Sequence, residues 1–213
     1  MDNVIVQANN YICNSKIAHL PVKSDDLVEL ISREGYDVFS YAQAKELIQF
    51  ANLASCVDAD GFTYTHEKFK AVLYNDELSS DERAFVLAHE LGHIILKHTT
   101  NGVNKKRRNE YWTSTQEEEA DDFAYQLLAP ICILKRKHIK TVDAIMQNTL
   151  LGKARSERVL GKVVSCKPVS NDRLVCNNFL GNHSGVLYLL LPILALFFAL
   201  WDITIMITLK LNQ

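Results

Sequence analysis

The sequence predicts an α+β fold that is mostly helical, with a small β-sheet and a hydrophobic helix near its C-terminal end. Three observations support this prediction. Apolar residues recur at helical spacing across 79–101 and 114–130. Two short segments, 61–65 and 70–74, alternate in a way that favours a β-hairpin. Residues 186–209 form an apolar run long enough to cross a bilayer core of about 30 Å as a helix.

The part of the chain before the hairpin is expected to alternate between helix and strand. Residues 24–26 (Ser-Asp-Asp) are typical of a helix N-terminus, and Gly35 offers a stop signal. Residues 36–39 are a short strand candidate, and residues 40–56 predict a second helix. After Pro130 the pattern stays helical, with further helices expected over 141–149 and 153–164.

The helix expected over 79–101 carries a chemical motif, His89-Glu90-Leu91-Gly92-His93. Ser79 and Glu82 form a capping box at its start, and Gly102 offers a stop signal. Histidines four residues apart lie on one helical face, so His89 and His93 can bind one metal ion. Glu90 can then take a proton from a water molecule at that metal. The alternative is a helix with two ordinary surface histidines.

The helix expected over 114–130 supplies candidates for a third metal ligand. Glu117 lies beside the apolar stripe of this helix, where a carboxylate would complete a set of two histidines and a glutamate. Glu117 also forms a capping box with Ser114, and the adjacent Glu118 and Glu119 leave the register open. Asp121 is a candidate to accept the second N–H of a ligand histidine and fix its tautomer.

These two segments, ERAFVLAHELGH at 82–93 and EEEADDFAYQLLAP at 117–130, resemble the ImmA/IrrE family of bacterial and phage metallo-endopeptidases. The resemblance covers roughly residues 26–160. It implies a zincin-like metallopeptidase domain in which His89, His93 and Glu117 bind Zn²⁺. It also implies a role in regulating a mobile element or a stress response, by cleavage of a helix-turn-helix repressor.

The residues and the resemblance together predict a zinc-dependent endopeptidase in which Glu90 is the general base. In such enzymes an edge strand beside the active helix commonly holds the substrate backbone, and residues 70–74 are a candidate for that strand. The alternative for residues 70–74 is a plain core strand. The alternative function is a non-enzymatic zinc-binding regulator that acts by binding a partner. Because a structural zinc site needs no general base, Glu90 favours the enzyme.

Composition limits the remaining possibilities. A net charge of −2 gives no general affinity for nucleic acid, so no direct nucleic-acid binding is expected. The five cysteines contain no C-x-x-C pair, and they are interpreted as reduced thiols of a cytosolic protein. The N-terminal residues lack the basic and then apolar order of a signal peptide.

The chain is expected to divide into a metallopeptidase domain at 1–165, a linker at 166–185 and a membrane-spanning segment at 186–209. The apolar segment contains one charged residue, Asp202, which lies near the membrane interface if the span ends at Trp201. The alternative for this segment is a buried helix. The protein is therefore expected to be membrane-anchored with its catalytic domain in the cytoplasm, and the alternative location is the cytoplasm itself.

Overall fold

The structure is a computed structural model, and it describes residues 2–15, 17, 19–67, 69–98, 102–105, 115–165 and 175. Its helices are α1 (Asp2–Ser15), α2 (Ser24–Arg33), α3 (Lys45–Phe50), α4 (Ser80–Ile95), α5 (Thr115–Leu128), α6 (Ile131–Arg136), α7 (Val142–Asn148) and α8 (Lys153–Ser165), with a 3₁₀ turn, η1 (Ala54–Cys56). Its strands are β1 (Asp37–Ser40), β2 (Gly61–His66), β3 (Phe69–Tyr74) and β4 (Gly102–Lys105). The predicted α+β class, mostly helical with a small sheet, is confirmed.

The four described strands form one sheet in the order β1-β3-β2-β4. Strands β2 and β3 form the predicted antiparallel hairpin, in which Thr63 pairs with Val72. Strand β1 runs parallel to β3 on its other side, and β4 runs antiparallel to β2. The prediction of residues 70–74 as an edge strand was therefore wrong. Strand β3 has a neighbouring strand on each side, because β1 pairs with one edge of it and β2 with the other. The alternative, a core strand, is therefore correct.

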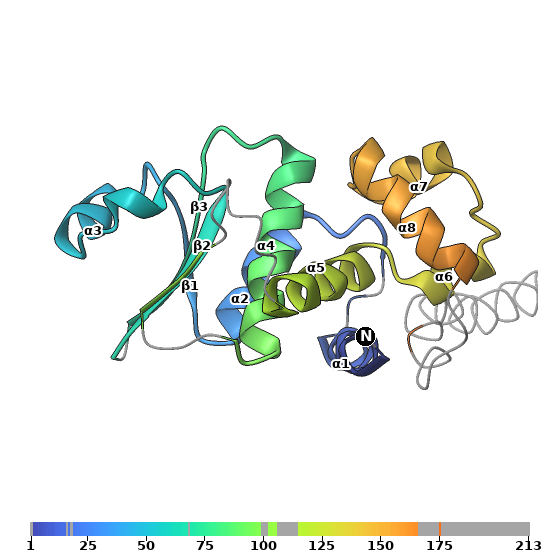
Figure 1. The fold of residues 1–213 in the computed structure, drawn as a ribbon, viewed down its shortest axis with the longest axis horizontal. Helices are drawn as coiled ribbons and strands as arrows, with labels where there is room; N and C mark the ends of the chain where they lie inside the picture. The colour runs from blue at the N-terminus through green and yellow to red at the C-terminus, as the bar shows by residue number, and fades with distance from the viewer. Residues whose placement is uncertain are drawn as a thin grey trace, which may run out of the picture.

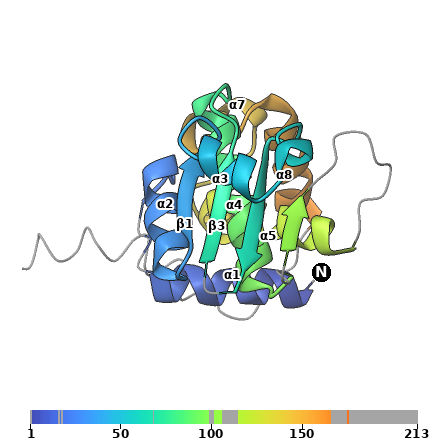
Figure 2. The same cartoon turned by 90° about the vertical axis from the view of Figure 1, so that its left-hand side faces the viewer.

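The sheet separates two hydrophobic clusters (Figures 1 and 2). On one face, α3 covers a small cluster that includes Ile48, Phe62 and Leu73. On the other face lie α2, α4 and α5 (Figure 1). The main core lies between these helices and α1, α6, α7 and α8. Helices α4 and α5 both contribute side chains that are fully buried in this core, among them Leu87, Leu91, Phe123 and Leu127.

Two predicted helices differ from those observed. In place of one helix over 40–56, the structure has two short elements, the helix α3 and the 3₁₀ turn η1. Asn52 adopts a φ of 54°, a left-handed conformation that ends a helix. The helix that carries the motif ends at Ile95, before the predicted stop at Gly102, which instead begins β4. Its predicted capping box is present, with the Ser79 N–H donating to the Glu82 carboxylate and the Glu82 N–H donating to the Ser79 side chain.

The N-terminal helix α1 was not anticipated from the sequence. It packs across α5, and its buried residues Val4, Ala8 and Ile12 belong to the main core. Gln126 of α5 donates to the buried Asn9 side chain at 2.7 Å, which satisfies both polar groups at this contact.

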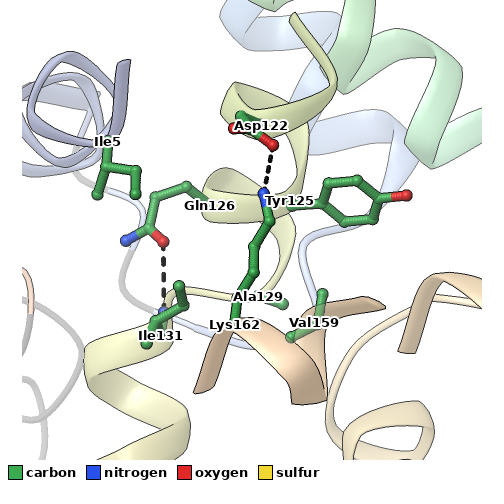
Figure 3. A pocket seen from close by; sticks show the side chains of 8 residues that line it. All are labelled: Ile5, Asp122, Tyr125, Gln126, Ala129, Ile131, Val159 and Lys162. Carbon is green, nitrogen blue, oxygen red and sulfur yellow. Dashed lines mark hydrogen bonds and ion pairs between the residues drawn. The ribbon is translucent and has the colours of Figure 1, made fainter. Parts of the chain in front are cut away.

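Helix α8 also contacts α5 (Figure 3). Its Lys162 forms an ion pair with Asp122 of α5. A hollow of about 10 Å³ remains beside this pair, lined by residues of α1, α5, α6 and α8 such as Ile5 and Val159. That volume has room for about one water molecule and is too small for a peptide substrate.

Within the described residues, no helix combines the length and the apolar character that a membrane span requires. The expected linker at 166–185, apart from Val175, and the expected span at 186–209 lie outside the described residues.

Candidate metal centre

Helix α4 places three polar side chains of the motif together in the interior. His89, Glu90 and His93 are exposed by only 5, 3 and 4%. Because His89 and His93 lie one turn apart on one helical face, their Nε2 atoms approach to 3.1 Å. Two imidazoles that share one buried point in this way are suited to binding a single cation.

Helix α5 brings a carboxylate to the same point. Gly92 allows the close approach of the two helices, since a Cβ at this position would lie 3.1 Å from the Ala120 carbonyl oxygen. Glu117 precedes Ala120 by nearly one turn, so its side chain reaches the histidines. Its two oxygens lie 3.4 Å from His89 Nε2 and 3.4 Å from His93 Nε2, respectively.

The three side chains fit a tetrahedral metal ion. Ligand bonds of about 2.0–2.1 Å place the ligand atoms of tetrahedral zinc about 3.3 Å apart. The separations of 3.1, 3.4 and 3.4 Å agree with that value. His89, His93 and Glu117 thus form a candidate metal site of two nitrogens and one oxygen. This is the donor set of catalytic zinc sites, in which a fourth position stays open. The structure brings Glu117, and not Glu119, to this point.

Asp121 lies beside His89, one of the two histidines that it was proposed to orient. Its Oδ1 lies 2.8 Å from His89 Nδ1, and its Oδ2 lies 3.8 Å from the Arg158 guanidinium. The contact leaves Nε2 of His89 directed toward His93 and Glu117. Arg158 lies in α8, so this helix places a positive charge next to Asp121, on the side of His89 that faces away from the candidate metal site.

The electrostatics of the site reflect its burial and its acidic partners. Burial alone lowers the pKa of His89, but hydrogen bonds with Asp121 and Glu117 outweigh burial and raise it to about 9. Burial raises the pKa of Glu117, yet hydrogen bonds with His89 and His93 outweigh this effect and hold the pKa well below its ordinary value. The fold therefore keeps a negative charge at Glu117, as a metal ligand requires.

Glu90 has a partner that the sequence did not identify. The Thr63 hydroxyl of β2 donates to Glu90 Oε2 at 2.6 Å, and both residues are buried. Thr63 lies on an inner strand of the sheet, with β3 on one side and β4 on the other. An inward threonine in a predicted strand was the available signal, but strand position alone did not indicate which helix it faces.

His98 also lies at the site, although its spacing from His93 in an unbroken helix would place it elsewhere. The helix ends in a turn in which the His98 N–H donates to the His93 carbonyl at 2.8 Å and Lys97 has a φ of 61°. This turn carries the His98 ring back, so that its Nδ1 lies 3.2 Å from His93 Nδ1. Its Nε2 lies 3.1 Å from Glu119 Oε2. Burial lowers the pKa of His98, and the neighbouring His93 lowers it further.

Glu118, the remaining candidate for the third ligand, does not reach this site. Glu118 is exposed on α5, and the side chains of His19, His66 and His138 are exposed elsewhere on the described surface. Ser114, which was expected to cap α5, lies outside the described residues.

Comparisons with known proteins agree with the motif pair. Residues 44–143 match the peptidase family described as the IrrE N-terminal-like domain. That range contains all three candidate ligands, together with Glu90 and Asp121. The chain is also 37% identical over 70 residues to an uncharacterized immunity region protein 2 of Bacillus phage phi105. The alignment covers 33% of this chain and 44% of that relative, so the chain matches less than half the length of the phage protein. Residues 44–143 are thus similar to the IrrE-like peptidase family that the two motifs resemble.

Proposed function

We propose that this protein is a zinc-dependent endopeptidase in which His89, His93 and Glu117 bind Zn²⁺ and Glu90 is the general base. The observation that carries the proposal is the convergence of the three candidate ligands from α4 and α5 at one point, with Glu90 buried next to His89 in the motif. The ligand separations suit tetrahedral zinc, and the peptidase family supports a hydrolytic role.

The chemistry divides between the metal and the protein. Zinc in such a site supplies Lewis acidity, which activates water and polarises the scissile carbonyl. Glu90 takes a proton from the attacking water and delivers it to the leaving amine nitrogen. Thr63 holds one oxygen of Glu90 in place, and Asp121 orients the ring of His89. Burying a carboxylate is costly unless it has a hydrogen-bond partner, and the Thr63 hydroxyl is that partner for Glu90.

The sheet suggests how a protein substrate is held. Among the described strands, β4 pairs with β2 and forms an edge. Asn104 of β4 lies opposite Thr63, the residue that contacts Glu90. An extended peptide that adds to the edge of β4 would run beside the general base. We therefore assign to β4 the substrate-holding role that the sequence had suggested for residues 70–74.

The substrate we propose is a regulatory protein, namely a helix-turn-helix repressor. The matched phage protein is named for an immunity region, a setting in which control of a repressor is expected. The metallopeptidase would act on this repressor directly, without contacting nucleic acid itself.

We also propose that residues 186–209 anchor the protein in a membrane, with the peptidase domain at 1–165 on the cytoplasmic side and 166–185 as the linker. The apolar composition of residues 186–209 supports an anchor. The cysteine content supports a reducing compartment for the domain.

The experiment that tests the peptidase proposal uses the full-length protein and candidate repressors encoded beside its gene. Wild type should cleave a repressor, and a chelator should stop the cleavage. Glu90→Gln should keep its zinc but lose cleavage, because it removes the base and leaves the ligands in place. Glu157→Gln, an exposed glutamate of α8, is the matched control and should cleave normally. If Glu90→Gln relieves repression as well as wild type does, the protein is instead a zinc-binding regulator that acts by partner binding.

A further inference from the structure

The ring of His93 has a second contact that the metal does not explain. Its Nε2 faces His89 and Glu117, whereas its Nδ1 faces the Nδ1 of His98 at 3.2 Å. The opposite nitrogen of His98 reaches Glu119 at 3.1 Å. The three side chains therefore form a chain from the metal site to the solvent side of α5, where the Glu119 side chain is 38% exposed.

The direction of the hydrogen bonds follows from what each atom can donate. An ionised carboxylate only accepts, so the Nε2 of His98 must carry the hydrogen that reaches Glu119. In a neutral imidazole the other nitrogen then has a lone pair, which makes His98 Nδ1 an acceptor. His93 Nδ1 must in turn carry a hydrogen and donate it to His98. His93 Nε2 is thereby left with its lone pair directed at the metal site.

The backbone positions His98 for this contact. The turn that ends α4 is closed by the His98 N–H on the His93 carbonyl and by the Lys97 N–H on the Ile94 carbonyl. This pair of bonds fixes the path of the chain immediately after the motif. The ring of His98, 8% exposed, then lies edge-on to that of His93, with ring centroids 5.3 Å apart.

We propose that His98 and Glu119 are positioning residues which fix the tautomer and orientation of His93 for metal binding. The inference rests on the proposed zinc site and adds residues outside the five-residue motif to it. Each ligand histidine is then supported from α5: His89 by the carboxylate of Asp121 directly, and His93 by the carboxylate of Glu119 through an imidazole. Glu119 thus has a role at the site without being a ligand.

Zinc affinity, measured on the full-length protein by competition with a chromogenic chelator, tests the proposal. Loss of a partner behind a ligand histidine typically weakens metal binding by roughly 10–100-fold, and His98→Leu should fall in this range. His98→Asn should recover most of the affinity, since its amide oxygen can accept the His93 Nδ1–H. Glu119→Gln should lose less than His98→Leu, because the amide oxygen still accepts from His98. His66→Leu, an exposed histidine of β2, is the matched control and should bind zinc as wild type does.

Nitrogen-15 NMR of the histidine rings in zinc-loaded wild type provides a measurement that does not depend on a variant's folding. His93 should be protonated at Nδ1, and His98 should be protonated at Nε2. A His98 protonated at Nδ1 and donating to His93 would overturn the proposal. So would His98→Leu with undiminished affinity, or His98→Leu and His98→Asn that are equally weak, because either result makes His98 a packing residue. If wild type itself binds no zinc, the failure lies with the proposed metal site and not with His98 alone.

Discussion

Thr63 donates its hydroxyl to Glu90 at 2.6 Å, and this bond joins the second strand of the sheet to the motif helix. Both residues are buried, at 1 and 3% exposure, so the bond is shielded from water. Thr63 therefore limits the positions that the Glu90 carboxylate can take. A general base must lie within hydrogen-bond reach of the proton that it removes, which gives this positioning a catalytic consequence.

Replacement of Thr63 should slow cleavage without removing the metal. A hydrogen bond to a charged group contributes about 1.5–3 kcal/mol, so Thr63→Val should reduce the cleavage rate about tenfold or more. Thr63→Ser keeps the hydroxyl and should stay near the wild-type rate. Cleavage assays combined with zinc analysis of the same samples give the measurement.

Thr65 offers a matched control for that substitution. It is a buried threonine on the same face of β2, and the described part of the chain offers its hydroxyl no hydrogen-bond partner. Thr65→Val should leave the rate unchanged. Equal losses in Thr63→Val and Thr65→Val would show that the effect arises from the strand and not from the bond to Glu90.

The metal-free protein should show a dependence of stability on pH that arises from His89 and Glu117. The fold raises the pKa of His89 from 6.5 to about 9, so its contribution is full below pH 6.5 and is lost as the pH rises through about 9. The fold lowers the pKa of Glu117 from 4.5, so its contribution is full above pH 4.5 and is lost as the pH falls. Together they stabilise the metal-free fold most between pH 4.5 and pH 6.5.

Thermal unfolding in the presence of a chelator measures this effect. The difference in melting temperature between wild type and His89→Gln should shrink as the pH rises from 6.5 toward about 9. A difference that stays constant over this interval would contradict the assignment. Zinc affinity should change in the opposite direction, strengthening with pH, because the metal must displace the proton of His89.

The sequence identified those parts of the site that local spacing determines. The motif fixes His89, Glu90 and His93 on one helix, and the position of Glu117 beside the apolar stripe of α5 brings it to the two histidines. The position of His98 could not be predicted, because the helix ends at a left-handed Lys97. Glycine or asparagine is the usual residue at such a helix end, and neither occurs there. The helix therefore ended seven residues before the expected stop at Gly102, and His98 turned back toward His93.

Contacts between distant parts of the chain explain the remaining differences. Strand β3 lies inside the sheet because β1 pairs with it, and no local pattern distinguishes an inner strand from an edge strand. Helix α1 contains several asparagines, which are poor helix formers, and its packing on α5 stabilises it. The Asn9–Gln126 bond links residues 117 positions apart, and single-sequence patterns do not indicate such a pairing.

Gly92 should prove essential to the contact between α4 and α5. An added Cβ would meet the Ala120 backbone at 3.1 and 3.2 Å, where a rigid helix cannot easily yield. Overpacking of this kind typically costs about 1–3 kcal/mol, so Gly92→Ala should lower the free energy of unfolding by that amount. It should also weaken zinc binding, because a shift of α5 moves Glu117 away from the histidines.

Chemical denaturation with and without zinc checks this prediction against Gly161→Ala. Gly161 lies in α8 with no atom within 4 Å of an added Cβ, so this control should be neutral or stabilise the protein by up to about 1 kcal/mol. Gly92→Ala with wild-type stability and wild-type zinc affinity would show that the two helices can separate without cost.

The proposed membrane anchor predicts where the full-length protein is found in a cell. Full-length protein should pellet with membranes and resist extraction by alkaline carbonate. Truncation after Cys176 keeps every described residue, and it should release a folded, zinc-binding protein into the soluble fraction. Two positive charges, Lys167 and Arg173, precede the apolar segment within the range where such charges favour the cytoplasmic side, whereas only Lys210 follows it. A protease added to sealed inverted vesicles should therefore digest the peptidase domain.

The matched control combines Leu194→Arg with Phe198→Arg. Each arginine near mid-span costs about 2.5–3.5 kcal/mol on insertion scales, so the double variant should return to the soluble fraction. Full-length protein that is soluble and monodisperse without detergent would reject the anchor and make residues 186–209 part of a folded core.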